Sequence, residues 1–274
     1  MIRKMYYLLP PYFRYLVRRI IYFPYDLLLA RNNTIVPPRG MIYTGSKDFI
    51  RQGIAWKDLF IQYGGLQDHH TVLDIGSGIG RVALGLTSFL KGSYEGFDAV
   101  RLGVDWCNKN ISPTYPNFNF QFIDLFNDLY KSKGLRAATF QFPYSDDSFD
   151  FACAISVFTH MLPDELENYL TQLHRTLKNR GHAVLTFFVL DDESISLMKN
   201  QKDGIHFDHI VDAKHALMDA NVKSANVGYQ RTYLKQLLHD QHFQIIHEFK
   251  GRWCGRASDH SLAFQDVLVI EKID

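Results

Sequence analysis

The hydrophobic positions of this chain change their spacing along its length, and from residue 71 onwards they predict alternating strands and helices. Apolar runs of strand length fall at residues 71–76, 93–99, 117–125, 149–158 and 180–190. Segments with apolar residues three or four positions apart predict helices at residues 80–90, 102–111 and 162–178. Such alternation is typical of a parallel sheet with helices on both faces.

The pattern changes towards both ends of the chain. Residues 191–228 are polar and irregular, and they precede a predicted helix at 229–240 and two late strands at 243–251 and 265–272. A late strand pair indicates an antiparallel addition at one sheet edge. We therefore expect an α/β fold: a doubly wound, Rossmann-like sheet of seven strands, mostly parallel, with an antiparallel C-terminal strand.

Length and composition agree with one α/β domain and an appendage. The chain has 274 residues, of which 46% are hydrophobic, so it can bury a sizeable core. We expect a helical N-terminal extension over residues 1–40 and a single domain over residues 41–274, in which residues 191–228 form an insert. A net charge of +1 gives no sign of nucleic-acid binding. Three widely spaced cysteines favour a reducing compartment, which predicts the cytoplasm.

The first 31 residues are basic and aromatic. They hold six Lys or Arg and one acid, and Arg14, Arg18 and Arg19 interrupt the apolar residues before a run long enough to span a bilayer is reached. Two interpretations stay open. The segment is a helix on a membrane surface, at the inner face, or it packs on the main domain or a second subunit. The oligomeric state stays open with them.

A glycine-rich turn follows the first predicted strand in "TVLDIGSGIGRVAL", residues 71–84. Gly76, Gly78 and Gly80 allow the backbone to approach a ligand, and the next helix offers free N–H groups. Nicotinamide sites usually have the spacing G-x-G-x-x-G/A, whereas this turn has G-x-G-x-G. Asp74 precedes the turn, and its carboxylate would repel a pyrophosphate but attract an ammonium group. These features favour S-adenosylmethionine as the cofactor.

Two further acids end the second and third strands. Asp98 can accept hydrogen bonds from both ribose hydroxyls, and Asp124 can accept one from the adenine amino group while Leu125 covers the ring. Three acids at three successive strand ends match one adenosyl amino acid that lies across the sheet. The predicted cofactor site also includes the neighbouring Ser77, Arg81 and Ala99.

From about residue 41 to its end, the chain resembles the class I S-adenosylmethionine-dependent methyltransferases that act on small molecules. The resemblance rests on "VLDIGSGIGR" and on the long segment from "FPYSDDSFDFACAISVFTHMLPDELENYL" to "RGHAVLTFF". One departure is "KNRGH", where the family usually has a Pro-Gly-Gly turn. The resemblance implies that the residues just after the fourth strand line the methyl-transfer site. These are Ser156, Val157, Phe158 and His160.

Methyl transfer needs an aligned nucleophile and often a base, and His160 is the candidate base because imidazole titrates near working pH. A contact from His160 to cofactor or substrate is the alternative role. Phe49, on the helix before the sheet, His206, in an insert that would act as a substrate lid, Tyr229 and Trp253 are candidate substrate contacts. The His and Asp residues between 203 and 215 fit no strong ligand pattern, so no metal is expected.

The resulting hypothesis is an enzyme that methylates a small-molecule acceptor, at a hydroxyl oxygen. The acceptor classes in view are a sugar, a lipid-linked saccharide, and a phenolic or polyketide-like compound. A nicotinamide-dependent oxidoreductase is one alternative, and the turn spacing and Asp74 count against it. A non-catalytic, adenosyl-binding, membrane-associated protein is the other, and three intact acids argue against it.

Overall fold

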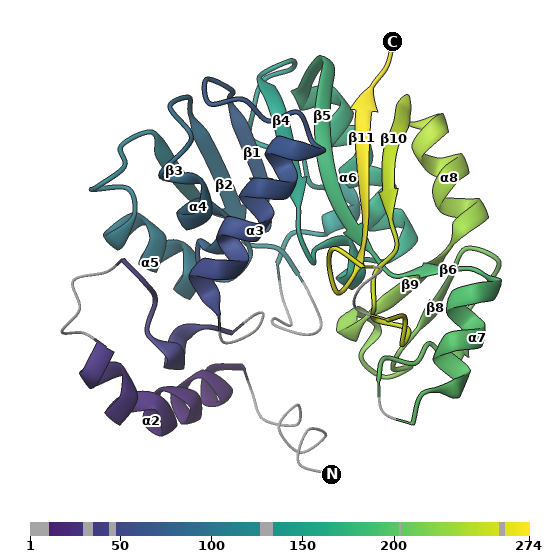
Figure 1. The fold of residues 1–274 in the computed structure, drawn as a ribbon, viewed down its shortest axis with the longest axis horizontal. Coiled ribbons are helices and arrows are strands. Elements are labelled where there is room, and N and C mark those ends of the chain that lie inside the picture. The colour runs from purple at the N-terminus through teal and green to yellow at the C-terminus, as the bar shows by residue number, and fades with distance from the viewer. Residues whose placement is uncertain (1–10, 30–34, 44–47, 127–133, 203, 258–260) are drawn as a thin grey trace.

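The computed structural model describes residues 11–29, 35–43, 48–126, 134–202, 204–257 and 261–274. Its centre is a seven-stranded sheet with the strand order β10-β11-β5-β4-β1-β2-β3 (Figure 1). β11 is antiparallel to both of its neighbours, and the other adjacent pairs are parallel. This confirms the predicted fold class and the edge position of the late strand pair. The strands are β1 (Val72–Ile75), β2 (Tyr94–Asp98), β3 (Phe118–Phe122), β4 (Phe149–Ala154), β5 (Leu177–Phe187), β10 (Phe243–Phe249) and β11 (Asp266–Lys272).

Helices cover both faces of the sheet, and each face has its own apolar core. α3 (Phe49–Gln62), α4 (Arg81–Leu86) and α5 (Arg101–Asn110) pack on one face, and α6 (Pro163–Thr176) and α8 (Arg231–Asp240) on the other. In β4, Phe151 and Cys153 face the first core, while Ala152 and Ala154 face the second. A strand that is buried on both sides is mostly apolar, which explains why β4 has a nearly continuous hydrophobic run with Asp150 as its one polar residue.

Two glycines set the distance between α3 and α4. A Cβ on Gly53 would lie 2.3 Å from the carbonyl oxygen of Arg81, and a Cβ on Gly85 would lie 2.2 Å from that of Gly53. The two helix backbones are therefore in direct contact. α4 is shorter than the predicted helix, since it ends at Leu86. β5 begins at Leu177, earlier than predicted, and takes in the "KNRGH" segment.

A second, four-stranded sheet lies in the insert and its two flanks. The sequence pattern predicted no regular structure within the insert, and it wrongly placed residues 229–230, which end β9, in a helix. Its strands, in the order β6-β9-β8-β7, are β6 (Val189–Leu190), β9 (Val227–Gln230), β8 (His215–Leu217) and β7 (His209–Ile210). α7 (Asp192–Asn200) and the short helix η5 (Lys223–Ala225) complete the insert. Strands of two to four residues are too short for a hydrophobic period to become visible, which is why the pattern missed them.

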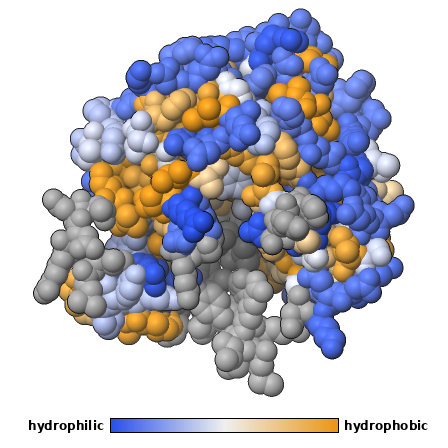
Figure 2. Space-filling model, viewed as in Figure 1, coloured by the Kyte–Doolittle hydropathy of each residue, from blue (hydrophilic) through white to orange (hydrophobic). Residues whose placement is uncertain are grey.

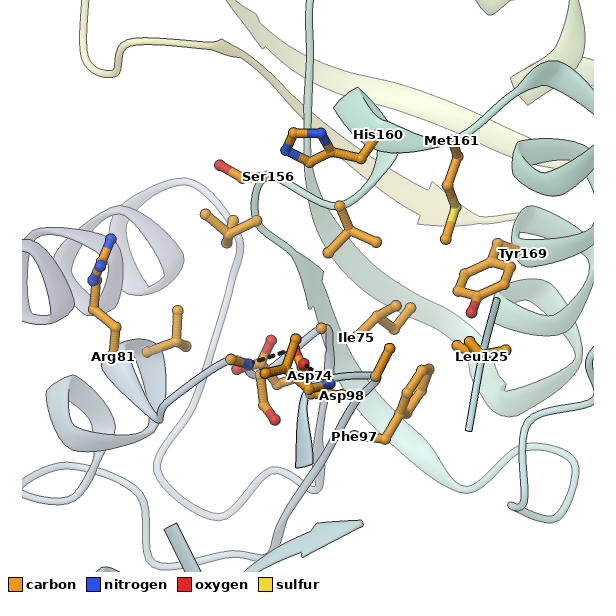
Figure 3. Close-up of a pocket in the computed structure, with 18 of the residues that line it drawn as sticks. Asp74, Ile75, Arg81, Phe97, Asp98, Leu125, Ser156, His160, Met161 and Tyr169 are labelled. Carbon is orange, nitrogen blue, oxygen red and sulfur yellow. Dashed lines mark hydrogen bonds between the residues drawn. The ribbon is translucent and has the colours of Figure 1, made fainter. Parts of the chain in front are cut away.

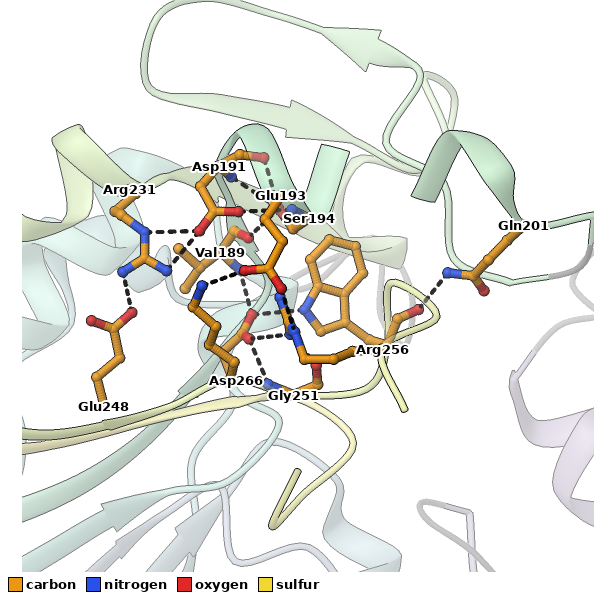
Figure 4. A network of polar contacts seen from close by, with 12 residues as sticks. Val189, Asp191, Glu193, Ser194, Gln201, Arg231, Glu248, Gly251, Arg256 and Asp266 are labelled. Carbon is orange, nitrogen blue, oxygen red and sulfur yellow. Dashed lines mark hydrogen bonds and ion pairs between the residues drawn. The ribbon is translucent and has the colours of Figure 1, made fainter. Parts of the chain in front are cut away.

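A polar network joins this second sheet to the main one (Figure 4). The buried carboxylate of Asp266, at the start of β11, accepts hydrogen bonds from the backbone N–H of Val189 and Gly251 and from Nε1 of Trp253, each at 2.7–2.8 Å. Arg231 forms ion pairs with Asp191 and with Glu248. The insert is thus held firmly against the main sheet.

α2 (Pro11–Leu29) confirms that the N-terminal extension contains a helix, while residues 1–10 and 30–34 of that extension lie outside the described residues. The carboxylate of Asp26 accepts hydrogen bonds from the backbone N–H of Arg39 at 2.6 Å and of Gly40 at 3.1 Å. Both donors belong to the short helix η2 (Arg39–Met41). Across the described part of the chain, no helix is long and apolar enough to cross a membrane.

Candidate functional site

A cavity of about 400 Å³ opens at the carboxyl ends of β1, β2 and β4 (Figure 3). Ligands of doubly wound sheets bind at this edge, because the strand order reverses there and leaves a crevice. Most of the predicted cofactor-site residues meet in its lining. Those present are Asp74, Gly76, Ser77, Gly78, Arg81, Asp98, Ala99, Leu125, Ser156 and Val157, together with the candidate base His160.

Asp74 lies in β1 and is only 1% exposed. The hydroxyl of Tyr94, on β2, donates a hydrogen bond to its Oδ2. Burial raises the pKa of Asp74 to about 6, although hydrogen bonds from Tyr94 and from the thiol of Cys153 oppose the shift. Near neutral pH the carboxylate is therefore charged at a cost, and a cation in the cavity would relieve that cost.

The turn after β1 requires glycine at two positions for different reasons. Gly76 has a φ of +75°, and a Cβ there would lie 2.4 Å from Cγ2 of Val157, so the turn contacts the segment after β4. Gly80 has a φ of +80°, and its Cβ would meet the side chains of Ile111 and Cys107. Gly80 does not line the cavity, which corrects its prediction as a cofactor contact: it allows α5 to pack against the turn.

Asp98 joins the loops that follow β1 and β2. Its Oδ2 accepts a hydrogen bond from the N–H of Gly78 at 2.8 Å, and its Oδ1 accepts one from that of Val100 at 2.7 Å. Each carboxylate oxygen keeps a lone pair for a ligand. Burial raises the pKa of Asp98 to about 6, and the two backbone N–H groups oppose this.

Two polar atoms in the lining are buried and have no hydrogen-bond partner among the described residues. They are Oγ of Ser77 and the hydroxyl oxygen of Tyr169. Buried polar groups in proteins nearly always have partners, so unpaired ones in a cavity indicate a polar ligand. Phe97 and Leu125 give the same cavity an apolar wall. A ligand with a flat ring and several polar groups fits this lining.

The opposite side of the cavity comes from the segment after β4, where Figure 3 places Ser156 and His160 across from the two acids. Ser156 has a φ of +59°, and its backbone N–H donates to Oγ1 of Thr186 at 2.7 Å. His160 ends the short helix η4 (Phe158–His160), and its Nδ1 lies 2.8 Å from the carbonyl oxygen of Ser224. A carbonyl only accepts, so Nδ1 carries the proton and Nε2 has a free lone pair. Burial lowers the pKa of His160, although the nearby backbone carbonyls oppose this.

A family model described as a methyltransferase domain matches residues 50–248 of this chain, which is most of its length and includes both sides of the cavity. The chain belongs to this methyltransferase family. It is an S-adenosylmethionine-dependent methyltransferase, and S-adenosylmethionine is its cofactor.

Solved structures with the same fold include proteins from archaea and bacteria. A protein from Pyrococcus horikoshii OT3 has a TM-score of 0.58 at 17% identity, over 84% of this chain and 93% of its own. A SAM-dependent methyltransferase from Methanosarcina mazei has a TM-score of 0.54 at 20% identity, over 78% and 97%. The 1,6-didemethyltoxoflavin-N1-methyltransferase of Burkholderia thailandensis, solved with 1,6-didemethyltoxoflavin and S-adenosylhomocysteine, has a TM-score of 0.52 at 16% identity, over 97% and 92%. At such identities the likeness shows the fold alone.

Besides Gly80, two residues predicted to contact the cofactor are placed elsewhere in the methyltransferase. The side chain of Asp124 is exposed and does not line the cavity, whereas its neighbours Leu125 and Phe126 do. Phe158 is fully buried in the core between β5 and α6, where it stacks on Phe187. Both residues were predicted as contacts because they lie near a strand end, but that position does not determine the direction of a side chain.

The four predicted substrate contacts also lie outside the cavity lining. Phe49 is buried under the guanidinium of Arg81, and His206 is a half-buried residue of the insert. Tyr229 is fully buried, and its hydroxyl donates to the backbone carbonyls of Met161 and Phe158. Trp253 is buried against Phe188 and Phe207, with its N–H bound to Asp266. Tyr229 and Trp253 therefore support the fold of the insert.

Other residues of the methyltransferase line the cavity without having been predicted as contacts. Met161 lies just before α6, Glu165 lies in the first turn of that helix and Tyr169 near its middle. Gln265 is the residue before β11. The rule that ligands bind beyond the strand ends could have pointed to the first turn of α6. Gln265 accepts a hydrogen bond from the hydroxyl of Ser156 at 2.8 Å, and no sequence signal connects two residues so far apart.

Proposed function

We propose that this methyltransferase transfers its methyl group to a hydroxyl oxygen of a small-molecule acceptor, with His160 as the general base. The observation that carries the proposal is the hydrogen bond from Nδ1 of His160 to the carbonyl of Ser224, at 2.8 Å, on the wall of the cofactor cavity. That bond fixes the tautomer in which Nε2 is the proton acceptor.

The residues on one side of the cavity fit S-adenosylmethionine. Asp98 offers two carboxylate oxygens to the ribose hydroxyls, and Asp74 offers a buried negative charge to the ammonium group. Leu125 would pack on the adenine ring, and the unpaired hydroxyl of Ser77 would gain a partner. When bound, the cofactor supplies an electrophilic methyl group on a sulfonium that is already a good leaving group.

The role of the protein is then to orient the acceptor and to remove its proton. His160 is neutral near pH 7 because burial lowers its pKa, so its free lone pair can accept the hydroxyl proton. The protonated ring would keep its hydrogen bond to the Ser224 carbonyl, which stabilises the developing charge. Acid–base help of this kind contributes about 10²–10⁴-fold to a rate.

Residues 191–228 would contribute to acceptor binding by holding His160 in place. Ser224, in η5, is the point at which the insert contacts the base. None of its described residues lines the cavity, so the insert would cover the acceptor side only after a movement towards it. We assign residues 41–274 to the catalytic domain and residues 1–40 to a separate extension. A sugar, a lipid-linked saccharide and a phenolic or polyketide-like compound are the acceptor classes proposed.

The first test is calorimetric titration of the protein with S-adenosylhomocysteine, with NADH and NADPH in parallel. Micromolar binding of S-adenosylhomocysteine alone is expected, and binding of a nicotinamide nucleotide alone would refute the cofactor assignment. Transfer of a labelled methyl group to a panel of the proposed acceptors then identifies the substrate class. Labelled products that carry the methyl group only on nitrogen or carbon would refute the hydroxyl proposal.

The role of His160 is tested with His160→Gln against the matched variant His174→Gln. His174 also lies near a backbone carbonyl and also has a pKa lowered by burial, but it is on the far part of α6 and does not line the cavity. We expect His160→Gln to lower the turnover rate by about 10²–10⁴-fold without weakening S-adenosylhomocysteine binding. Equal activity of the two variants would exclude His160 as the base.

A further inference from the structure

α2 presents an exposed apolar stripe along one side. Leu16, Ile20, Phe23 and Leu27 follow one another at spacings of four, three and four residues, which places them on a single helix face. Their exposed fractions are 40%, 66%, 61% and 55%. Single exposed apolar residues are common on proteins, but a stripe of four over three turns indicates a surface that something covers.

The other side of α2 is already occupied by the protein itself. Asp26 binds the backbone of η2 through two N–H groups, and the guanidinium carbon of Arg39 lies 3.9 Å from the ring centre of Tyr25. A Cβ on Gly40 would lie 2.8 Å from Cα of Arg19, so the two backbones are in close contact. These contacts fix the roll of the helix and turn the stripe away from η2.

The stripe lies at the edge of the molecule where the cavity opens. Figure 1 places α2 below the ends of the parallel strands, and Figure 2 shows apolar surface at the lower left, where α2 lies. Other exposed apolar side chains belong to this edge. Phe126 follows β3 and lines the cavity, and Leu262 and Phe264 precede β11, whose first residue pairs with the last residue of β5.

The charge of the segment selects the partner that would cover the stripe. The first 31 residues contain six Lys or Arg and a single acid, Asp26, whose carboxylate is engaged by η2. Arg19 is exposed beside the stripe, and Arg18 lies over the ring of Tyr22. A basic helix with an apolar face matches the boundary between anionic headgroups and acyl chains.

We propose that α2 lies in the plane of an anionic phospholipid bilayer, with the Leu16–Leu27 stripe among the upper acyl chains. The edge that carries the cavity mouth then faces the membrane. Docking in the plane agrees with the finding that no described helix can cross a bilayer. It does not depend on the chemistry proposed above, because a bilayer can bind the protein whether or not methyl transfer occurs.

The test is sedimentation of the full chain with vesicles of phosphatidylcholine that contain roughly one third phosphatidylglycerol, compared with pure phosphatidylcholine vesicles. The double variant Ile20→Gln/Phe23→Gln keeps good helix formers but removes the centre of the stripe. We expect it to bind the anionic vesicles about tenfold or more weakly. Ile61→Gln is the matched control, because Ile61 is an exposed apolar residue at the end of α3 and should leave binding unchanged.

Salt gives a second measurement that needs no variant. Raising the ionic strength from about 0.1 M to about 1 M shortens the Debye length from about 10 Å to about 3 Å, and should weaken binding of the wild type to the anionic vesicles. Absence of binding, or equal binding by the double variant, overturns the proposal. So does a wild-type dimer, seen by light scattering, that the double variant loses while neither protein binds vesicles, because the stripe would then cover a second copy.

Discussion

Replacement of Asp74 by Asn should make the protein more stable and its ligand affinity lower. Asp74 is fully buried beside Tyr94, and the amide of Asn has the same shape as the carboxylate. Its Oδ1 can still accept the hydrogen bond from the Tyr94 hydroxyl. What the substitution removes is the charge, and that charge is costly at a buried position.

The size of the effect follows from the pKa of Asp74, which burial raises from 3.8 to about 6. This shift corresponds to about 3 kcal/mol, an upper figure for a buried group with two hydrogen-bond donors. The unfolded chain loses the proton at a lower pH than the folded protein does. The stability of the wild type therefore falls as the pH rises from about 4 to about 6, and above pH 6 the contribution of Asp74 to stability is constant. The Asp74→Asn variant should not show this decrease.

Denaturant unfolding of both proteins between about pH 4 and pH 8 measures the difference. Near pH 4 the free energy of unfolding should be the same for the variant and the wild type. Above pH 6 it should be higher for the variant by about 3 kcal/mol. Changed hydrogen bonds can add a constant offset at every pH. Calorimetry should find S-adenosylhomocysteine affinity lower by about tenfold or more, since hydrogen bonds to charged groups contribute about 1.5–3 kcal/mol. Asp105→Asn, at an exposed position of α5, is the control. A difference in unfolding free energy that does not change with pH would refute the proposed cost of burying the Asp74 charge. An unchanged affinity for S-adenosylhomocysteine would refute the proposed contact between Asp74 and the ammonium group.

Three other substitutions test the scaffold of the site. Asp266→Asn should destabilise the protein by about 1–3 kcal/mol, because the amide cannot accept hydrogen bonds from all three donors. Denaturant unfolding measures this loss, and calorimetry should find an unchanged affinity for S-adenosylhomocysteine. Ser156→Gly should be more stable than Ser156→Ala by about 1–2 kcal/mol, because both lose the hydroxyl but only Gly adopts a φ of +59° without strain; equal denaturation midpoints would contradict this. Gly53→Ala should cost at least about 1–3 kcal/mol by separating α3 from α4, and an unchanged melting temperature would contradict that contact.

The main sheet could be predicted because its strands are either hydrophobic runs or alternations of apolar and polar residues, as in β3, between turn residues. β4 is the clearest run, since burial on both faces makes five of its six residues apolar, with Asp150 as the exception. The strands of the insert could not be predicted in this way. β7, for instance, has two residues, and both are exposed, so no alternation of apolar and polar positions records it.

The part of the cavity that is lined by the ends of β1 and β2 was predictable for a related reason. Asp98 and the glycines of the turn act through their position at a strand end, which the local sequence fixes. Contacts on the acceptor side depend on the packing of distant segments. Trp253 turns inward because Asp266 accepts its N–H, and Gln265 reaches Ser156 only because β11 lies beside β5. A sequence pattern does not contain these pairings.

Unfavourable features gather at the cavity, and they indicate where ligand binding would stabilise the protein. Asp74 and Asp98 both carry raised pKa values, Ser156 has a left-handed backbone, and Ser77 has a buried hydroxyl without a partner. Asp266 is also buried, and burial raises its pKa as well, but hydrogen bonds from two backbone N–H groups and one side chain of the protein satisfy its carboxylate. The acids therefore differ in their hydrogen-bond partners and not in the direction of their pKa shifts. The scaffold satisfies its buried acid internally, whereas the acids of the cavity keep lone pairs for a ligand, and a ligand that binds only the folded state adds its binding free energy to stability.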